Sequence, residues 1–391
     1  MTVTTPQGFR AAGVAAGLKS SGALDTAVVV NDGPDHVAAG VFTTNRVVAA
    51  PVVWSRQVVE DGRVDAVVLN SGGANACTGP EGFSDTHETA EHLAGALQAA
   101  GTDVSSGDVA VCSTGLIGVR LDMPKLLPGV TAAVESLSAT GGDDAATAIM
   151  TTDTVPKTVA VARGGWTVGG MAKGAGMLAP GLATMLVVVT TDAKVDVRRA
   201  QGALAAAVAE TFNRTDSDGC MSTNDTVLLL ASGASGVTPG PDEFEDALAE
   251  ACATLARALI ADAEGASHEI SITVQGASSE DAAEAVAKAV ARSNLFKTAI
   301  FGGDPNWGRI VSAVGTVPAD VAPFDPLHLD VAVNGVQVCR QQGVGEDRSL
   351  VDLSGRDVEV VVDLHAGDAS ATVWTNDLTH DYVHENSAYS T

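Results

Sequence analysis

Residues 169–192 read GGMAKGAGMLAPGLATMLVVVTTD. The first half of this stretch is rich in glycine and carries one cation, Lys173, whereas residues 185–191 are mostly apolar and β-branched and predict a buried strand. Thr184 therefore stands at the mouth of a strand, directly after Ala183. A strand fixes the Cα position and a glycine loop lets a substrate approach the backbone, so a threonine at this place is suited to act as a nucleophile.

The hydroxyl of a threonine is weakly acidic and needs a base before it can attack. Cleavage of the peptide bond between Ala183 and Thr184 would free an α-amino group. Such an amine titrates near pH ~8 and can serve as the base for the hydroxyl of its own residue. The alternative is that Thr184 simply begins a strand, and residue chemistry alone favours this alternative.

Two further segments place polar groups at the ends of predicted elements. An apolar strand over 108–112 runs into Ser-Thr-Gly at residues 113–115, where a hydroxyl and backbone N–H groups can face a developing oxyanion. A helix predicted over 244–261 is followed by Glu264, where an acidic side chain can face the amine of a ligand. On composition alone, the first segment is an ordinary loop and the second holds a solvated glutamate.

The segment KGAGMLAPGLATMLVVVTTDA, residues 173–193, resembles the self-cleavage signature of the ornithine acetyltransferase family, also called glutamate N-acetyltransferase. The shared pattern is a Lys-Gly segment, a proline, Ala-Thr-Met-Leu and a closing Thr-Asp-Ala. Similar segments continue along nearly the whole chain, among them NSGGANACTG, TTDT, STNDT and FGGDPNWGRI.

The resemblance implies roles for particular residues. Autocatalytic cleavage between Ala183 and Thr184 would give an alpha chain of residues 1–183 and a beta chain of residues 184–391, with Thr184 as the nucleophile. Thr114 and Gly115 would form the oxyanion hole. The residues implied to bind substrate are Thr151, Thr152, Lys173, Thr184, Glu264, Asn386 and Thr391.

The resemblance also implies the reaction. A member of this family is a transferase that moves the acetyl group of N2-acetyl-L-ornithine through a threonine acyl-enzyme to L-glutamate, in arginine biosynthesis. No cofactor is needed because the acetyl group arrives attached to the donor amine. Acetyl-CoA as a second donor, which would make the enzyme bifunctional, stays open, as does a specialised pathway. Family members assemble from cleaved chains as a heterotetramer.

Strand and helix patterns, together with the resemblance, predict an α/β protein. The expected fold is the αββα sandwich of the N-terminal-nucleophile-like type found in DmpA and ornithine acetyltransferase, with a smaller C-terminal α/β domain. The composition break GVTPGPD at residues 236–242 suggests domains over 1–238 and 239–391, with the oxyanion hole and nucleophile in the first.

Composition excludes several kinds of partner. The net charge of −26 disfavours nucleic acid and anionic membranes, and no apolar run approaches the ~20 residues of a membrane helix. Five scattered cysteines without a CxxC spacing predict reduced thiols and a cytoplasmic protein. Three motifs are candidates for a metal or nucleotide site, and none fits. The dinucleotide fingerprint near Gly174 is incomplete, and the calcium-like loop lacks its glutamate. The histidines do not have metal-ligand spacing, so we expect no metal or nucleotide site.

Two other functions remain open at this point. An N-terminal-nucleophile aminopeptidase or amidase would use the same nucleophile and pass the acyl group to water. A small-molecule binding protein would keep the chain uncleaved.

Overall fold

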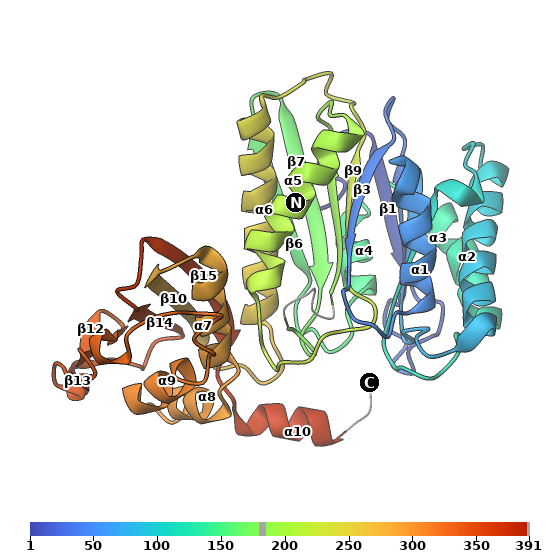
Figure 1. Ribbon diagram of the computed structural model, residues 1–391. Helices are drawn as coiled ribbons and strands as arrows, with labels where there is room; N and C mark the ends of the chain where they lie inside the picture. The colour runs from blue at the N-terminus through green and yellow to red at the C-terminus, as the bar shows by residue number, and fades with distance from the viewer. Residues whose placement is uncertain (180–184, 389–391) are drawn as a thin grey trace.

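The structure is a computed structural model, and it describes residues 1–179 and 185–388 of the 391. Two packed sheets and their flanking helices form one body, and a third sheet with its own helices lies beside it (Figure 1). The predicted cleavage residues Ala183 and Thr184 and the predicted binding residue Thr391 lie outside the described residues.

The first sheet, sheet A, pairs its first three strands antiparallel and its last two strands parallel. Its strands are, in spatial order, β1 (Phe9–Val14), β2 (Thr26–Asn31), β4 (Ala66–Ser71) and β5 (Val109–Thr114). The second sheet, sheet B, places β8 parallel to β9 and antiparallel to β7. Its strands are β3 (Val37–Phe42), β9 (Thr226–Ala231), β8 (Leu186–Thr191), β7 (Trp166–Lys173) and β6 (Lys157–Arg163).

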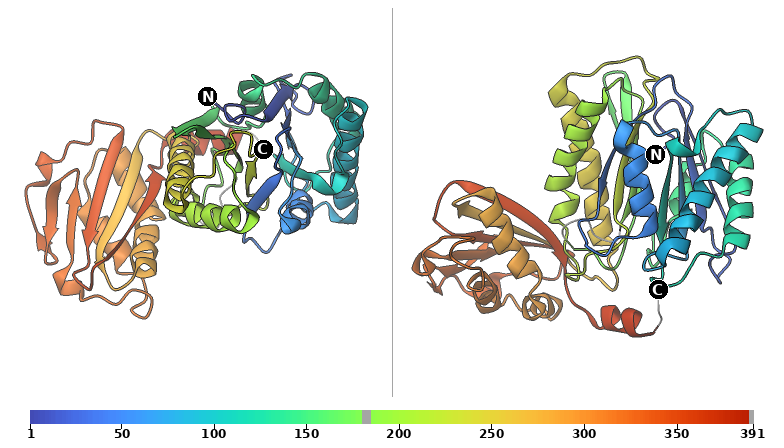
Figure 2. Two further views of the ribbon diagram at one scale, coloured as in Figure 1. Left: turned by 90° about the horizontal axis from the view of Figure 1, so that it is seen from above. Right: turned by 45° about the vertical axis from the view of Figure 1, so that its right-hand side comes forward.

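Helices cover the outer face of each sheet, so the layers run helix, sheet, sheet, helix (Figure 2). The helices of this body are α1 (Ala50–Val58), α2 (Gly79–Ala99), α3 (Met123–Glu135), α4 (Gly142–Ala148), α5 (Val197–Glu210) and α6 (Pro241–Ala261). Helices α2 and α3 pack on sheet A, and α5 and α6 pack on sheet B. The predicted αββα sandwich is confirmed.

Strand β8 shows why the sequence around it is so apolar. Leu186 and Val188 face sheet A, whereas Val187 and Val189 face helices α5 and α6, and every residue of the strand is buried. A strand that is buried on both faces needs apolar side chains at successive positions rather than at alternate ones. Burial on both sides holds the strand firmly, and its first residue follows Met185 directly.

The third sheet, sheet C, is mixed and carries helices on one face. Its strands are, in spatial order, β13 (Gly343–Val344), β12 (Val336–Arg340), β11 (Asp330–Val333), β14 (Asp357–Asp363), β10 (Glu269–Ala277) and β15 (Ala369–Asn376). Its helices are α7 (Glu280–Ala291), α8 (Asn294–Phe301) and α9 (Trp307–Val314). The last helix, α10 (His380–Ala388), leaves sheet C and extends beneath the sandwich (Figure 1).

Helix α6 belongs by its packing to the sandwich. Phe244, Leu248 and Leu255 are fully buried in the core that α6 shares with sheet B. The sequence-based division at residues 238 and 239 falls before this helix, because a Gly-Pro break marks a loop but not the surface on which the next helix packs. We propose a division after Ala261 instead.

Among the described residues, no helix is long and apolar enough to cross a membrane.

Candidate active site

A cavity of about 190 Å³ lies where strands β5 and β7 end. Residues from distant parts of the chain line it, including the loop after β5, the loop after β7, the exit of α6 and helix α10. The predicted site residues that the structure brings together in this cavity are Thr114, Gly115, Thr151, Thr152, Lys173, Glu264 and Asn386. The cavity is therefore the candidate active site.

The turn at Thr114 and Gly115 is held against the loop that follows β4. The carbonyl oxygen of Thr114 accepts hydrogen bonds from the N–H groups of Gly72 and Gly73, each at 3.0 Å. Gly115 has φ +127°, and a Cβ there would lie 2.6 Å from the backbone nitrogen of Gly73. Only glycine fits this conformation and this close approach, so the local sequence fixes where the Gly115 N–H points.

Lys173 is the cation of the site, and its side chain is buried with 2% of the residue exposed. Its Nζ donates a hydrogen bond to Oγ1 of Thr114 at 3.0 Å. An ammonium group has no lone pair, so the Thr114 oxygen is the acceptor and its own O–H proton stays available to another acceptor. Burial lowers the pKa of Lys173, and the negative charge of Asp153 partly offsets that effect.

Asp153 lies beneath the cavity and joins several of its parts. Its Oδ1 accepts from Lys157 Nζ at 2.6 Å and from the N–H of Gly174 at 2.7 Å, and its Oδ2 accepts from the N–H of Thr151 at 2.9 Å. Burial acts to raise the pKa of Asp153, but Lys173, Lys157 and these hydrogen bonds outweigh burial and lower the pKa to about 2. Asp153 is therefore ionised at any physiological pH.

Glu264 reaches the cavity from the exit of helix α6. Its Oε2 accepts a hydrogen bond from Nδ2 of Asn386 at 2.8 Å, which brings α10 to the site. Thr379 Oγ1 donates to the carbonyl of Gly265 at 2.7 Å and fixes the start of the same helix. A Cβ on Gly176 would lie 2.6 Å from Glu264 Oε2, so the glycine leaves room for this carboxylate.

Several residues of the site do not follow from the sequence reasoning. Asp153 stands in the TTDT segment, but only the fold shows that it pairs with Lys157 and that the charge of Lys173 acts on it. Gly176 is one of many glycines in its segment, and no pattern singles it out. The cavity lining also includes the partly exposed apolar side chains Leu116, Ile117 and Met177.

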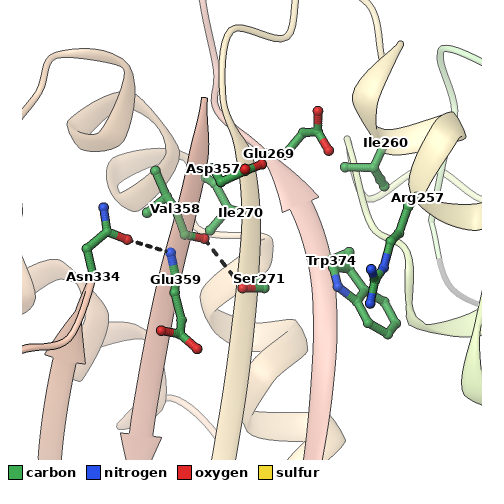
Figure 3. Close-up of a pocket in the computed structure, with 10 residues that line it drawn as sticks. All are labelled: Arg257, Ile260, Glu269, Ile270, Ser271, Asn334, Asp357, Val358, Glu359 and Trp374. Carbon is green, nitrogen blue, oxygen red and sulfur yellow. Dashed lines mark hydrogen bonds between the residues drawn. The ribbon is translucent and has the colours of Figure 1, made fainter. Parts of the chain in front are cut away.

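A second cavity, of about 460 Å³, lies between helix α6 and sheet C (Figure 3). The guanidinium of Arg257 lies 5.7 Å from the ring centroid of Trp374 there, and Glu269 and Glu359 line the same hollow. None of the predicted site residues lines this cavity.

Among the described residues, no group of three or more His, Cys, Asp or Glu side chains is arranged to hold a metal ion.

The fold and the site together define a class of enzyme. Two packed sheets between helical layers are the architecture of N-terminal-nucleophile enzymes, and the cavity offers a hydroxyl, a backbone N–H group and a buried cation at the sheet ends. Such groups stabilise the oxyanion that forms during acyl transfer.

Comparison with known proteins gives the family. A model of the ArgJ family matches residues 10–391, and the chain belongs to this family. It is 63% identical over 390 residues to the arginine biosynthesis bifunctional protein ArgJ of Streptomyces coelicolor, with all of both chains covered. It is 62% identical over 392 residues to the ArgJ protein of Thermobifida fusca, again with all of both chains covered.

One solved structure is the ornithine acetyltransferase of Mycobacterium tuberculosis complexed with ornithine. It is 63% identical to the aligned part of this chain, has a TM-score of 0.46, and the match covers 47% of this chain and 96% of that chain. The family assignment confirms the predicted family and the predicted kind of enzyme, an acyltransferase of arginine biosynthesis.

The contact between Gly176 and Glu264 is open to a direct test. Gly176→Ala should displace the Glu264 carboxylate, because the added methyl group would lie 2.6 Å from Oε2. We expect kcat/KM for N2-acetylornithine to fall on the order of ten- to a hundredfold, as for other small displacements in active sites. Gly202→Ala is the matched control, since a Cβ there meets nothing within 4 Å. Equal kinetics for both variants would show that Glu264 does not position substrate.

The low pKa of Asp153 predicts part of the acid sensitivity of the protein. A carboxylate with a folded-state pKa of about 2, below the ordinary value of 3.8, stabilises the fold above pH 4 and loses this effect as the pH falls towards 2. The contribution is about 2 kcal/mol. Denaturant unfolding at pH 6 and pH 3 should therefore show a smaller pH dependence in Asp153→Asn than in the wild type. Asp320→Asn, at an exposed loop position, should keep the wild-type dependence.

Proposed function

We propose that this chain is an ornithine acetyltransferase that moves the acetyl group of N2-acetyl-L-ornithine to L-glutamate, giving L-ornithine and N-acetyl-L-glutamate. The observation that carries the proposal is the meeting of Thr114, Lys173, Glu264 and Asn386 in one cavity of a chain that matches ArgJ proteins over its full length. An oxyanion-stabilising turn, a buried cation and a carboxylate suit a substrate with an amide, a carboxylate and an ammonium group.

Activation is proposed to occur by self-cleavage between Ala183 and Thr184. The hydroxyl of Thr184 attacks the preceding carbonyl carbon, the peptide nitrogen leaves with a proton, and water then hydrolyses the resulting ester. The products are the chains 1–183 and 184–391. Strand β8 of the second chain is buried between sheet A and helices α5 and α6, so separation of the chains would expose a large apolar surface.

In turnover, the Thr184 hydroxyl attacks the acetyl carbonyl of the donor, and the α-amine of the same residue accepts the proton. The Thr114 O–H and the Gly115 N–H stabilise the oxyanion, and Lys173 holds the Thr114 oxygen so that its proton faces the substrate. The α-amine of Thr184 passes this proton to the nitrogen of the donor, and ornithine leaves as the free amine. The neutral amine of glutamate then attacks the threonine ester, its proton passes through the α-amine of Thr184 to the leaving Thr184 oxygen, and N-acetylglutamate and the free hydroxyl are formed.

Substrate recognition is assigned to the remaining polar residues of the cavity. Lys173 pairs with the carboxylate of the substrate, and Glu264, held by Asn386, faces the side-chain ammonium of ornithine. Thr151, Thr152 and Thr391 complete the set.

Further properties come from the family and are part of the proposal. The word bifunctional in the names of the relatives supports acetyl-CoA as a second acetyl donor, which would add an N-acetylglutamate synthase reaction. No other cofactor is proposed. We also propose that two pairs of cleaved chains assemble as a heterotetramer in the cytoplasm.

Intact mass measures the proposed cleavage. The wild type should appear as two chains that divide after residue 183, whereas Thr184→Ala should remain one chain of about 39.3 kDa and lose turnover, because it lacks the attacking hydroxyl. Thr254→Ala, on the exposed side of α6, should behave as the wild type. A single uncleaved chain in an active, folded wild type would contradict the proposal.

The requirement for glutamate separates transfer from hydrolysis. Incubation of the wild type with N2-acetylornithine should release ornithine mainly when glutamate is present, with one N-acetylglutamate formed for each ornithine. Ornithine release at the same rate without glutamate, with acetate as the product, would identify an amidase.

A further inference from the structure

Asn224 and Asp225 lie between the ends of the two sheets of the sandwich. Both side chains are buried, with 3% and 0% of each residue exposed. They precede strand β9 and lie in the STNDT segment. Each side chain contacts the backbone next to a residue of the proposed reaction centre, but neither lines the cavity.

Asn224 holds the loops at the end of sheet A. Its Nδ2 donates to the carbonyl of Ala74 at 2.6 Å and to the carbonyl of Ser113 at 2.8 Å. Ser113 directly precedes Thr114, the proposed oxyanion residue. The two hydrogens of one amide group therefore fix the strand end that carries the oxyanion hole.

Asp225 holds the start of strand β8 in sheet B. Its Oδ1 accepts a hydrogen bond from the N–H of Met185 at 3.1 Å, and the carbonyl of Met185 accepts from the N–H of Thr226 at 3.1 Å. Met185 directly follows Thr184 in the sequence. The N–H and the carbonyl of Met185 are therefore both held by the neighbouring residues Asp225 and Thr226.

The Asp225 carboxyl has an unusual environment. Burial raises its pKa well above the ordinary range, and the hydrogen bond from the Met185 N–H and the charge of Lys173 offset burial only in part. Its Oδ2 is buried and has no hydrogen-bond partner among the described residues. A buried polar atom without a partner is costly, and its presence calls for an explanation.

We propose that Asn224 and Asp225 form a clamp of positioning residues that sets the oxyanion turn of sheet A against the nucleophile end of sheet B, with Asp225 accepting the hydrogen bond of the Met185 N–H. The proposal rests on the role of Thr184 as nucleophile. The clamp acts on two strand ends through one dipeptide, so displacement of either side chain changes the distance between the reacting groups. A displacement of about 1 Å at such a site can reduce the rate on the order of a hundredfold.

The test compares Asp225→Asn with Asp225→Ala. Asparagine keeps an oxygen that accepts the hydrogen bond of the Met185 N–H, so cleavage and kcat should stay within about fivefold of the wild type. Alanine removes the anchor, so kcat should fall at least about tenfold and cleavage should slow, while KM changes less than about threefold. Asn224→Ala should give the same split between kcat and KM.

Asp192→Asn is the matched control. Asp192 is also buried and accepts from the N–H groups of Gln7 and Thr167, but it lies at the opposite end of β8. Its replacement should lower the melting temperature without changing the cleaved fraction or kcat. If Asp225→Ala does not fold, the kcat and KM of Asp225→Asn and Asn224→Ala still test the clamp.

Three results would overturn the clamp. They are wild-type kcat in folded Asp225→Ala or Asn224→Ala, a loss of kcat in folded Asp225→Asn as large as in Asp225→Ala, and a parallel fall of kcat in Asp192→Asn. Thr184→Ala separates the two proposals. An inactive Thr184→Ala beside a normal Asp225→Ala rejects the clamp alone, whereas an active Thr184→Ala rejects the nucleophile and the clamp with it.

Discussion

The buried ion pair of Asp153 with Lys157, near the charge of Lys173, is the interaction on which the cavity depends. A charge in a protein interior is strongly unfavourable unless an opposite charge and hydrogen bonds accompany it. Lys157 also pairs with Asp262 at 2.6 Å, at the exit of helix α6. The ionic chain Asp153–Lys157–Asp262 therefore joins the segment of Thr151 to the segment that carries Glu264, and it fixes these two parts of the cavity wall relative to each other.

Hydrophobic packing and this ionic chain have complementary effects. The strands around the site are buried on both faces, so their side chains are apolar along almost their whole length. The polar side chains lie at the ends of the strands. Thr114 and Lys173 are the last residues of β5 and β7, and Asn224 and Asp225 directly precede β9. The apolar sandwich thus gives the site a rigid support, and the few buried polar groups at its edge have fixed orientations because each lacks room to move.

The sequence predicted the family, the layered fold and seven of the residues that line the cavity, and most of this came from the resemblance around residues 173–193. Local patterns supported the buried strand over 186–191, because its apolar character arises from packing on both faces. Local patterns did not reveal the hydrogen bond from Asn386 to Glu264, because these residues are 122 positions apart in the sequence. They also did not show that α6 packs on sheet B, because helical periodicity identifies an apolar face but not the surface it covers.

The proposed ping-pong reaction makes one cavity accept two substrates of different charge. The protein carries 48 acidic and 22 basic residues, so its overall field opposes the approach of glutamate more than that of acetylornithine. In the proposed mechanism, Lys173 pairs with the carboxylate that both substrates share. Discrimination in this mechanism falls to Glu264, which would attract the ornithine ammonium and repel the side-chain carboxylate of glutamate. This repulsion favours a glutamate orientation with the side-chain carboxylate directed away from Glu264.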